Sequence, residues 1–143
     1  MSESRPANVQ PVEESEATGR VAEIYADIKA TKQIDFVPLF WRVLATNPPH
    51  LELIWTSLKR IMHPESLGLP SRLEPLTREI IALAVSATNG CPYCINSHSA
   101  AARKLGMDTE TLGEVMSIVG LFNATNTIAE GYQIVPDVLP PLD

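Results

Sequence analysis

Four residues near the middle of the chain carry side chains that can exchange electrons and protons. The two cysteines of the sequence, Cys91 and Cys94, are three residues apart. His98 follows Cys94 by four residues, and Glu79 precedes Cys91 by twelve. Two thiols at this spacing can form and break a disulfide, while the imidazole and the carboxyl group can move protons. The pattern indicates thiol redox chemistry.

Cys91 is predicted to cap a helix. Asn89-Gly90 is a helix-stop signal, and Pro92 suits the first position of a new helix, which makes Cys91 the expected N-cap residue. The N-terminus of a helix carries a partial positive charge that stabilises a thiolate. We therefore expect the pKa of a thiol in this first turn to lie below its usual value of about 8.5.

The spacing also suggests a role for each group. Cys94 is the expected attacking thiolate, and Cys91 is expected to resolve its oxidised product into a disulfide. His98 shares a helix face with Cys94 because the two residues are four apart. Glu79 lies in the preceding apolar helix and could reach His98 if the two helices pack antiparallel. A carboxyl group among apolar neighbours holds a proton more readily, which suits a proton relay.

The segments around these residues predict an all-α protein of about six or seven helices. Apolar residues recur at helical spacing, and strand signals are nearly absent. The segment "IIALAVSA" is apolar on nearly every side, so we expect its helix to be buried in the core or at a subunit contact. The helices are expected at residues 19–32, after Pro38, at 51–62, 75–88 and 92–105, after an N-cap at Asp108, and at 121–130.

Length and composition indicate one domain with a real hydrophobic core. The chain has 143 residues and 45% hydrophobic residues. We divide it into an N-terminal arm (1–16), a helical domain (17–135) with the CxxC motif at 91–94, and a proline-containing C-terminal tail (136–143).

Charge and hydropathy limit the partners and the expected compartment. The net charge is −6, which argues against binding to nucleic acid or to an anionic membrane. No apolar run reaches the ~18 residues of a membrane span. The polar start has no signal-peptide core, so the expected compartment is the cytoplasm. Thiols are kept reduced there, which favours a redox-active or metal-binding CxxC pair over a structural disulfide.

The stretch E-I-I-A-L-A-V-S-A-T-N-G-C-P-Y-C-I-N-S-H resembles the core motif of the AhpD-like alkylhydroperoxidases of the carboxymuconolactone decarboxylase superfamily. The shared pattern is a Glu, eleven residues, CxxC, three residues and a His. Glu79, Cys91, Cys94 and His98 match it without a gap. The segment "LFWRVLATNPPHLELIW" also resembles the helical lead-in of single-domain, peroxidase-related members.

The resemblance implies an all-helical fold, a homo-oligomer (a trimer or a hexamer), and thiol-dependent reduction of peroxides with Cys94 as the peroxidatic cysteine. It also implies a lipoyl-type dithiol as electron donor and no metal or haem. One position departs from the pattern: Tyr93 stands where the best-known members carry a second histidine. A phenol with a pKa near 10 cannot replace an imidazole as a base at pH 7. We expect Tyr93 to line the substrate pocket.

Several alternatives stay open at this point. The cysteines could be a zinc half-site, which needs two more ligands, or inert buried thiols. His98 could be a surface helix residue, and Glu79 could pair with Arg78 or Arg103. The chain could also be a lyase of the carboxymuconolactone decarboxylase type, which needs no cysteine pair, or a non-enzymatic oligomer that senses redox state through its disulfide.

Overall fold

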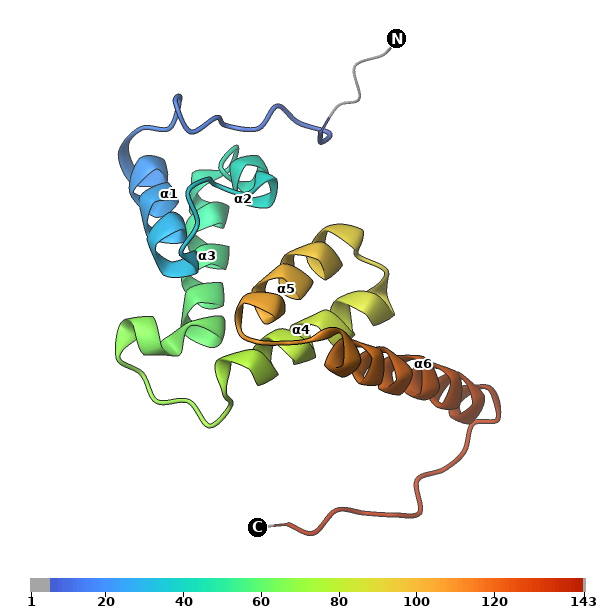
Figure 1. Cartoon of the computed structure of the whole chain (residues 1–143). Coiled ribbons are helices and arrows are strands. Elements are labelled where there is room, and N and C mark those ends of the chain that lie inside the picture. Colours follow the sequence, from blue (N-terminus) through green and yellow to red (C-terminus); the bar gives the residue numbers. More distant parts are fainter. Residues whose placement is uncertain (1–5, 143) are drawn as a thin grey trace. The chain divides into compact units, whose positions relative to one another are not determined.

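A computed structural model describes residues 6–142, and within that range the protein is all-helical (Figure 1). The prediction of an all-α fold is confirmed. The chain divides into two compact units, one ending at Arg72 and the other starting at Leu73. The helices are α1 (Gly19–Lys32), α2 (Leu39–Leu44), α3 (Pro48–Met62), the 3₁₀-helix η1 (Pro64–Leu67), α4 (Pro75–Asn89), α5 (Pro92–Lys104) and α6 (Thr109–Gly131).

The first unit packs α1, α2 and α3 around two tryptophans. The rings of Trp41 and Trp55 meet edge to face with centroids 5.2 Å apart, and both side chains are buried. Aliphatic residues of α1 and α3, including Ile28 and Leu51, complete this core. The three helices are the blue to green ribbons of Figure 1.

Part of the predicted N-terminal arm is held on this first unit. The Tyr25 hydroxyl donates to the Val12 carbonyl at 2.9 Å, and burial raises the pKa of this phenol to about 12. The Glu14 carboxylate accepts hydrogen bonds from Lys29 Nζ and from the Val37 backbone N–H, each at 2.7 Å. Residues 1–5 of the arm and residue 143 of the tail lie outside the described residues, and the three-part division of the chain stays a prediction.

The second unit is a helical hairpin, α4–α5, followed by the long helix α6. Its buried cluster is Leu83, Ala102 and Met107, with Ile80 and Ile95 packed against it. The two helical segments expected after Asp108 are one continuous helix. Gly120, the only break signal between them, costs a helix only about 1 kcal/mol and leaves its hydrogen-bond ladder intact.

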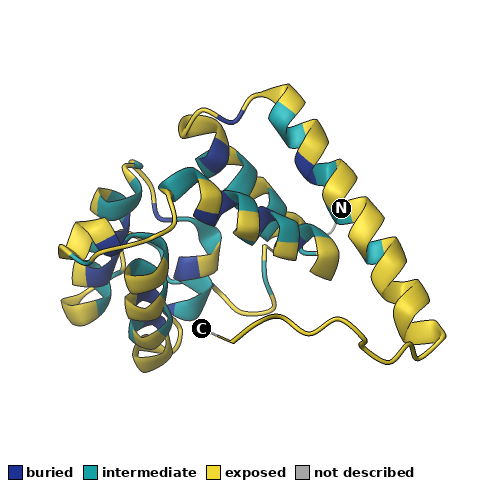
Figure 2. Cartoon of the chain, turned by 90° about the horizontal axis from the view of Figure 1, so that it is seen from below, coloured by how far each residue is buried: buried dark blue, intermediate teal, exposed yellow. Residues whose placement is uncertain are grey.

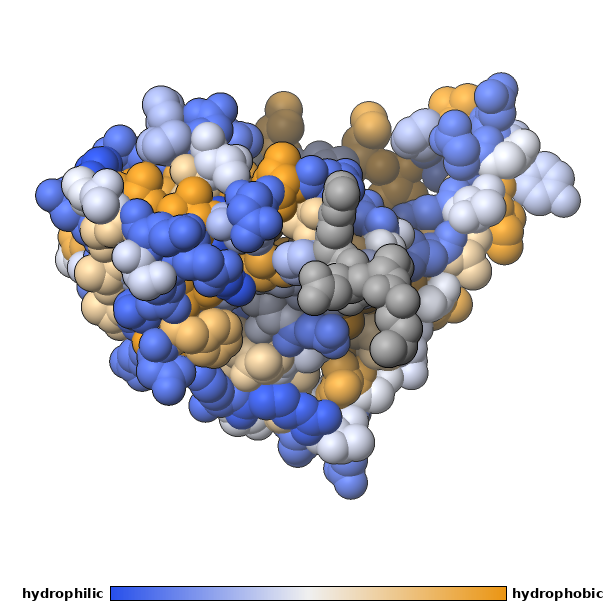
Figure 3. Space-filling model, turned by 90° about the horizontal axis from the view of Figure 1, so that it is seen from above, coloured by the Kyte–Doolittle hydropathy of each residue, from blue (hydrophilic) through white to orange (hydrophobic). Residues whose placement is uncertain are grey.

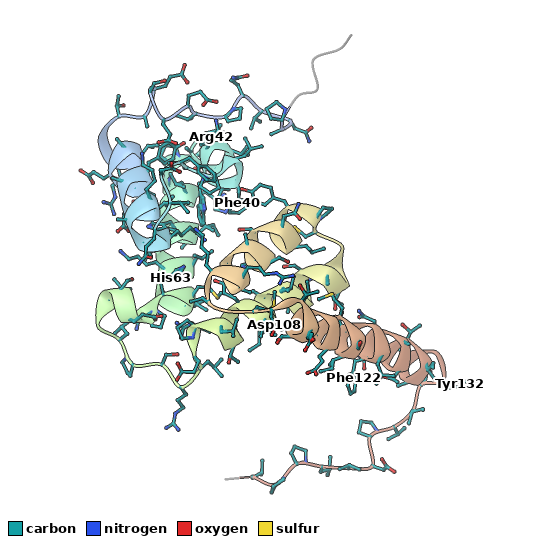
Figure 4. All side chains as sticks on the ribbon, in the orientation of Figure 1. Phe40, Arg42, His63, Asp108, Phe122 and Tyr132 are labelled. Atoms are coloured by element: carbon teal, nitrogen blue, oxygen red, sulfur yellow. A yellow bond between two sulfur atoms is a disulfide. The ribbon has the colours of Figure 1, made fainter. Side chains whose placement is uncertain are left out.

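Asp108 caps α6 as predicted, because its side chain accepts from the Thr111 N–H at 2.7 Å. Figure 4 labels Asp108 at the start of α6, Phe122 along it and Tyr132 at its end. Figure 2 shows most of α6 as exposed, and Val115 is the one buried residue of this helix.

Candidate redox site

The turn between α4 and α5 places the cysteines as the sequence indicated. Gly90 ends α4 in the left-handed conformation with φ of 67°, which only glycine adopts at little cost. Cys91 is the N-cap of α5 and Pro92 occupies its first turn. The backbone N–H of Cys94 points at Cys91 Sγ over 3.3 Å, so the cap is a sulfur atom.

Cys91 and Cys94 are joined by a disulfide, with Cα atoms 5.3 Å apart, within the usual range for such a bond. Both residues are half-buried at the surface of the second unit. The bond sits at the positive end of the α5 dipole, where a sulfur released by reduction would be stabilised as a thiolate. A lowered pKa of the reduced thiol stays a prediction, since bonded sulfurs do not titrate.

Glu79 and His98 meet across the hairpin. His98 Nδ1 lies 2.7 Å from Glu79 Oε2, and the two side chains are 22% and 7% exposed, respectively. Glu79 lies on the buried face of α4. Leu83 and Ser86, which follow it by four and seven residues, lie on the same buried face. Nδ1 is engaged by the carboxylate, which leaves Nε2 as the ring nitrogen that can exchange a proton with a reacting group.

The arginines considered as partners for Glu79 contact backbone oxygens. Arg78 Nη1 donates to the Leu73 carbonyl at 2.6 Å, and Arg103 Nη1 donates to the Met107 carbonyl at 3.3 Å. Arg103 Nη1 also donates to Thr109 Oγ1 at 3.2 Å. The contact of the Glu79 carboxylate with His98 of α5 is the one that the relay hypothesis requires.

Ser86 helps to hold the cysteine turn in place, although it was not among the site residues predicted from the sequence. Its backbone carbonyl accepts the N–H of Cys91 at 3.0 Å, which ties the cysteine turn to the last turns of α4. Its side chain is buried and donates to the Ala82 carbonyl at 2.6 Å. The sequence does indicate that Ser86 is near the site, because it follows Glu79 by seven residues and so lies on the same helix face.

Tyr93 is 42% exposed in the first turn of α5. A groove of about 390 Å³ lies in the second unit between α4 and α6, and its lining residues do not include Tyr93. The expectation that Tyr93 lines a substrate pocket stays a prediction.

Across residues 6–142, no three His, Cys, Asp or Glu side chains are grouped so that they could hold a metal ion. In the same range no helix combines the length and the apolar composition needed to cross a membrane.

Comparison with known proteins defines the family. Residues 58–135 match the model of the carboxymuconolactone decarboxylase family. The chain is also similar to the crystal structure of an alkylhydroperoxidase AhpD core from Rhodospirillum rubrum, with 39% identity and a TM-score of 0.85 over 93% of this chain and 96% of that one. The chain therefore belongs to the carboxymuconolactone decarboxylase family, and within it is AhpD-like.

Curated relatives match a smaller share of the chain. The chain is 34% identical over 71 residues to an alkyl hydroperoxide reductase AhpD from Streptomyces avermitilis, which covers 50% of this chain and 40% of that protein. It is 27% identical over 111 residues to an (R)-2-haloacid dehalogenase from Pseudomonas putida, covering 78% and 35%, respectively. The chain thus spans less than half the length of these curated relatives.

Proposed function

We propose that this chain is a thiol-dependent peroxidase that reduces organic hydroperoxides through the Cys91–Cys94 pair, with Glu79 and His98 as a proton relay. The observation that carries the proposal is the placement of a closed cysteine pair and a 2.7 Å His98–Glu79 contact on a single helical hairpin. The similarity to proteins named alkyl hydroperoxide reductase supports the same reaction.

In the oxidative half-reaction, the Cys94 thiolate attacks the terminal oxygen of the hydroperoxide. The S–O bond forms, the O–O bond breaks, and the departing alkoxide takes a proton from His98 to leave as an alcohol. Cys94 is then a sulfenic acid. The Cys91 sulfur attacks it, the S–S bond forms, and hydroxide leaves with a proton as water.

In the reductive half-reaction, an external dithiol exchanges with the disulfide. It supplies two electrons and two protons and becomes a disulfide itself, while Cys91 and Cys94 return to the reduced state. The family resemblance favours a lipoyl-type dithiol as this donor and a trimeric or hexameric homo-oligomer as the working form.

The test is turnover of tert-butyl hydroperoxide with reduced lipoamide. Wild type is expected to turn over, and Cys94→Ser is expected to be inactive. Cys91→Ser should gain one oxygen atom at Cys94 and then stall, which intact-mass measurement detects. Ser97→Ala, an exposed change on the same helix, serves as the control that keeps activity. Turnover that survives in Cys94→Ser would reject the assigned nucleophile.

A carboxymuconolactone decarboxylase-type lyase is the second candidate, because the matched family bears that name. Lyase activity needs no sulfur redox cycle, so it would persist in both cysteine variants. A non-enzymatic redox sensor would instead form the disulfide with peroxide but show no turnover with any dithiol.

A further inference from the structure

Once the disulfide is reduced, the α4–α5 hairpin carries a thiol, an imidazole and a carboxylate in succession. His98 Nδ1 lies 2.7 Å from Glu79 Oε2, so the carboxylate orients the ring and leaves its other nitrogen, Nε2, for the sulfur. A cysteine, a histidine and a group that orients the histidine are the parts from which cysteine hydrolases are built. Such a set transfers acyl groups, a reaction in which sulfur is neither oxidised nor reduced.

The position of His98 on α5 places its ring beside Cys94. The two residues are four apart, so their Cβ atoms are about 5–6 Å from each other on one helix face. Side chains of a helix lean toward its N-terminus, so the imidazole lies over the turn that holds Cys94. Cys94 is half-buried and the His98 side chain is 22% exposed, whereas that of Glu79 is 7% exposed. A ligand can therefore reach the sulfur and the imidazole while the carboxylate stays away from water.

The start of α5 also suits the charge that develops during acyl transfer. Attack of a thiolate on a carbonyl carbon places negative charge on the carbonyl oxygen. The backbone N–H of Cys94 points at Cys91 Sγ over 3.3 Å, and sulfur is a weak acceptor. The oxyanion of an acyl group on Cys94 would be a stronger acceptor for this N–H, and it would lie at the positive end of the helix dipole.

The surroundings of the sulfur favour an uncharged substrate. The chain has no Asp, Glu, Lys or Arg from residue 80 to residue 102, a stretch that includes both cysteines. Tyr93 between them is 42% exposed and offers an aromatic surface. On the face of the molecule that Figure 3 shows, hydrophobic residues are exposed among hydrophilic ones. A charged acyl group would find no partner of opposite charge in this stretch, whereas a neutral one needs none.

We propose that the reduced hairpin has a second activity, the hydrolysis of uncharged carboxylic esters, and that the Cys91–Cys94 disulfide switches it off. His98 takes the proton of the Cys94 thiol, and the thiolate attacks the carbonyl carbon. The S–C bond forms, the C–O bond to the leaving group breaks, and His98 returns the proton to the departing alkoxide. Water then attacks the thioester and gives a proton to His98, the C–S bond breaks, and the carboxylic acid leaves.

This activity rests on the proposed function in one respect, the assignment of Cys94 as the reactive sulfur. The two activities differ in their need for Cys91. Peroxide turnover requires Cys91 to form the disulfide, whereas ester hydrolysis requires the Cys94 sulfur to be free of it. A variant without the Cys91 thiol therefore separates the two reactions.

The test is hydrolysis of p-nitrophenyl acetate by Cys91→Ser, followed as release of p-nitrophenolate. This variant stalls as a peroxidase but is expected to hydrolyse the ester over many turnovers, and Cys94→Ser is expected to be inactive. Adding His98→Gln to Cys91→Ser should slow the release at least about hundredfold, because the proton acceptor for water is lost. One acetyl group should then remain on Cys94, which intact-mass measurement detects. Adding the exposed change Ser97→Ala instead is the matched control and should leave the rate unchanged.

Wild type provides a second measurement that needs no variant. After reduction with a phosphine that is then removed, it should hydrolyse the ester. Oxidation with diamide should stop the hydrolysis, and renewed reduction should restore it. Circular dichroism shows whether each variant and each redox state keeps its helices.

Four results would overturn the proposal. They are a folded Cys91→Ser protein that is no faster than Cys94→Ser, release that ends after one equivalent, a folded His98→Gln variant that is as fast as its parent, and oxidised wild type that is as fast as the reduced protein. Wild type that hydrolyses the ester but does not turn over peroxide would support this activity and contradict the peroxidase alone. Peroxide turnover without ester hydrolysis would do the reverse.

Discussion

Replacing Glu79 with glutamine removes the charge of the relay and keeps its shape. The glutamine oxygen can still accept a hydrogen bond from His98 Nδ1, so the 2.7 Å contact survives as a neutral one. A hydrogen bond to an ionised group is worth about 1.5–3 kcal/mol and a neutral one about 0.5–1.5 kcal/mol. The side chain is 7% exposed, so solvent screens little of this difference. We expect the free energy of unfolding to fall by about 1–2 kcal/mol.

The effect on catalysis follows from the same difference. If His98 gains and loses a proton during each turnover, the Glu79 carboxylate stabilises its charged form. Removing the negative charge then raises the barrier by about 1–2 kcal/mol, which slows turnover roughly fivefold to thirtyfold. The assay is the single-turnover rate of hydroperoxide reduction by the pre-reduced protein, with urea unfolding measured on the same preparation.

Glu114→Gln is the matched control, because Glu114 is an exposed glutamate of the same unit. Its stability should change by less than ~0.5 kcal/mol and its rate should not change. A folded Glu79→Gln protein that reacts at the wild-type rate would refute the relay. A loss of stability without a loss of rate would reduce Glu79 to a structural partner of His98.

Two further predictions concern Tyr93 and the N-terminal segment. Tyr93→His should raise the rate of hydroperoxide reduction, because imidazole titrates near neutrality and a phenol does not. The control is Tyr132→His at an exposed site, which should leave this rate unchanged. In Glu14, hydrogen bonds from Lys29 and the Val37 N–H lower the carboxyl pKa from its ordinary value of 4.5. Its contribution to stability is thus full above that pH and is lost as pH falls through the folded-state pKa. Glu14→Gln should lower Tm at pH 7, and the difference from wild type should shrink as the pH falls below 4.5. A difference that stays constant as the carboxyl group is titrated would contradict this reading.

The geometry of the site could be predicted from the sequence because it is local. Asn89-Gly90 reverses the chain between two helices, and its signals lie within a few residues. Glu79 is ten residues before Asn89 and His98 is nine after it, so an antiparallel hairpin brings the two to the same level. The spacing of CxxC likewise determines the separation of the sulfurs. None of these relations depends on distant parts of the chain.

The sequence could not tell which apolar surfaces the chain covers by itself. Helical period assigns residues to faces, but it does not identify what packs on each face. The segment "IIALAVSA" indicated a buried helix, yet Ile81 and Val85 of α4 are 48% and 54% exposed, while Leu83 between them is 1% exposed. The same excess of apolar surface recurs on α6, where Leu121 is 59% exposed. The second unit buries only one side of α4, so the burial expected for this helix is met on that side alone.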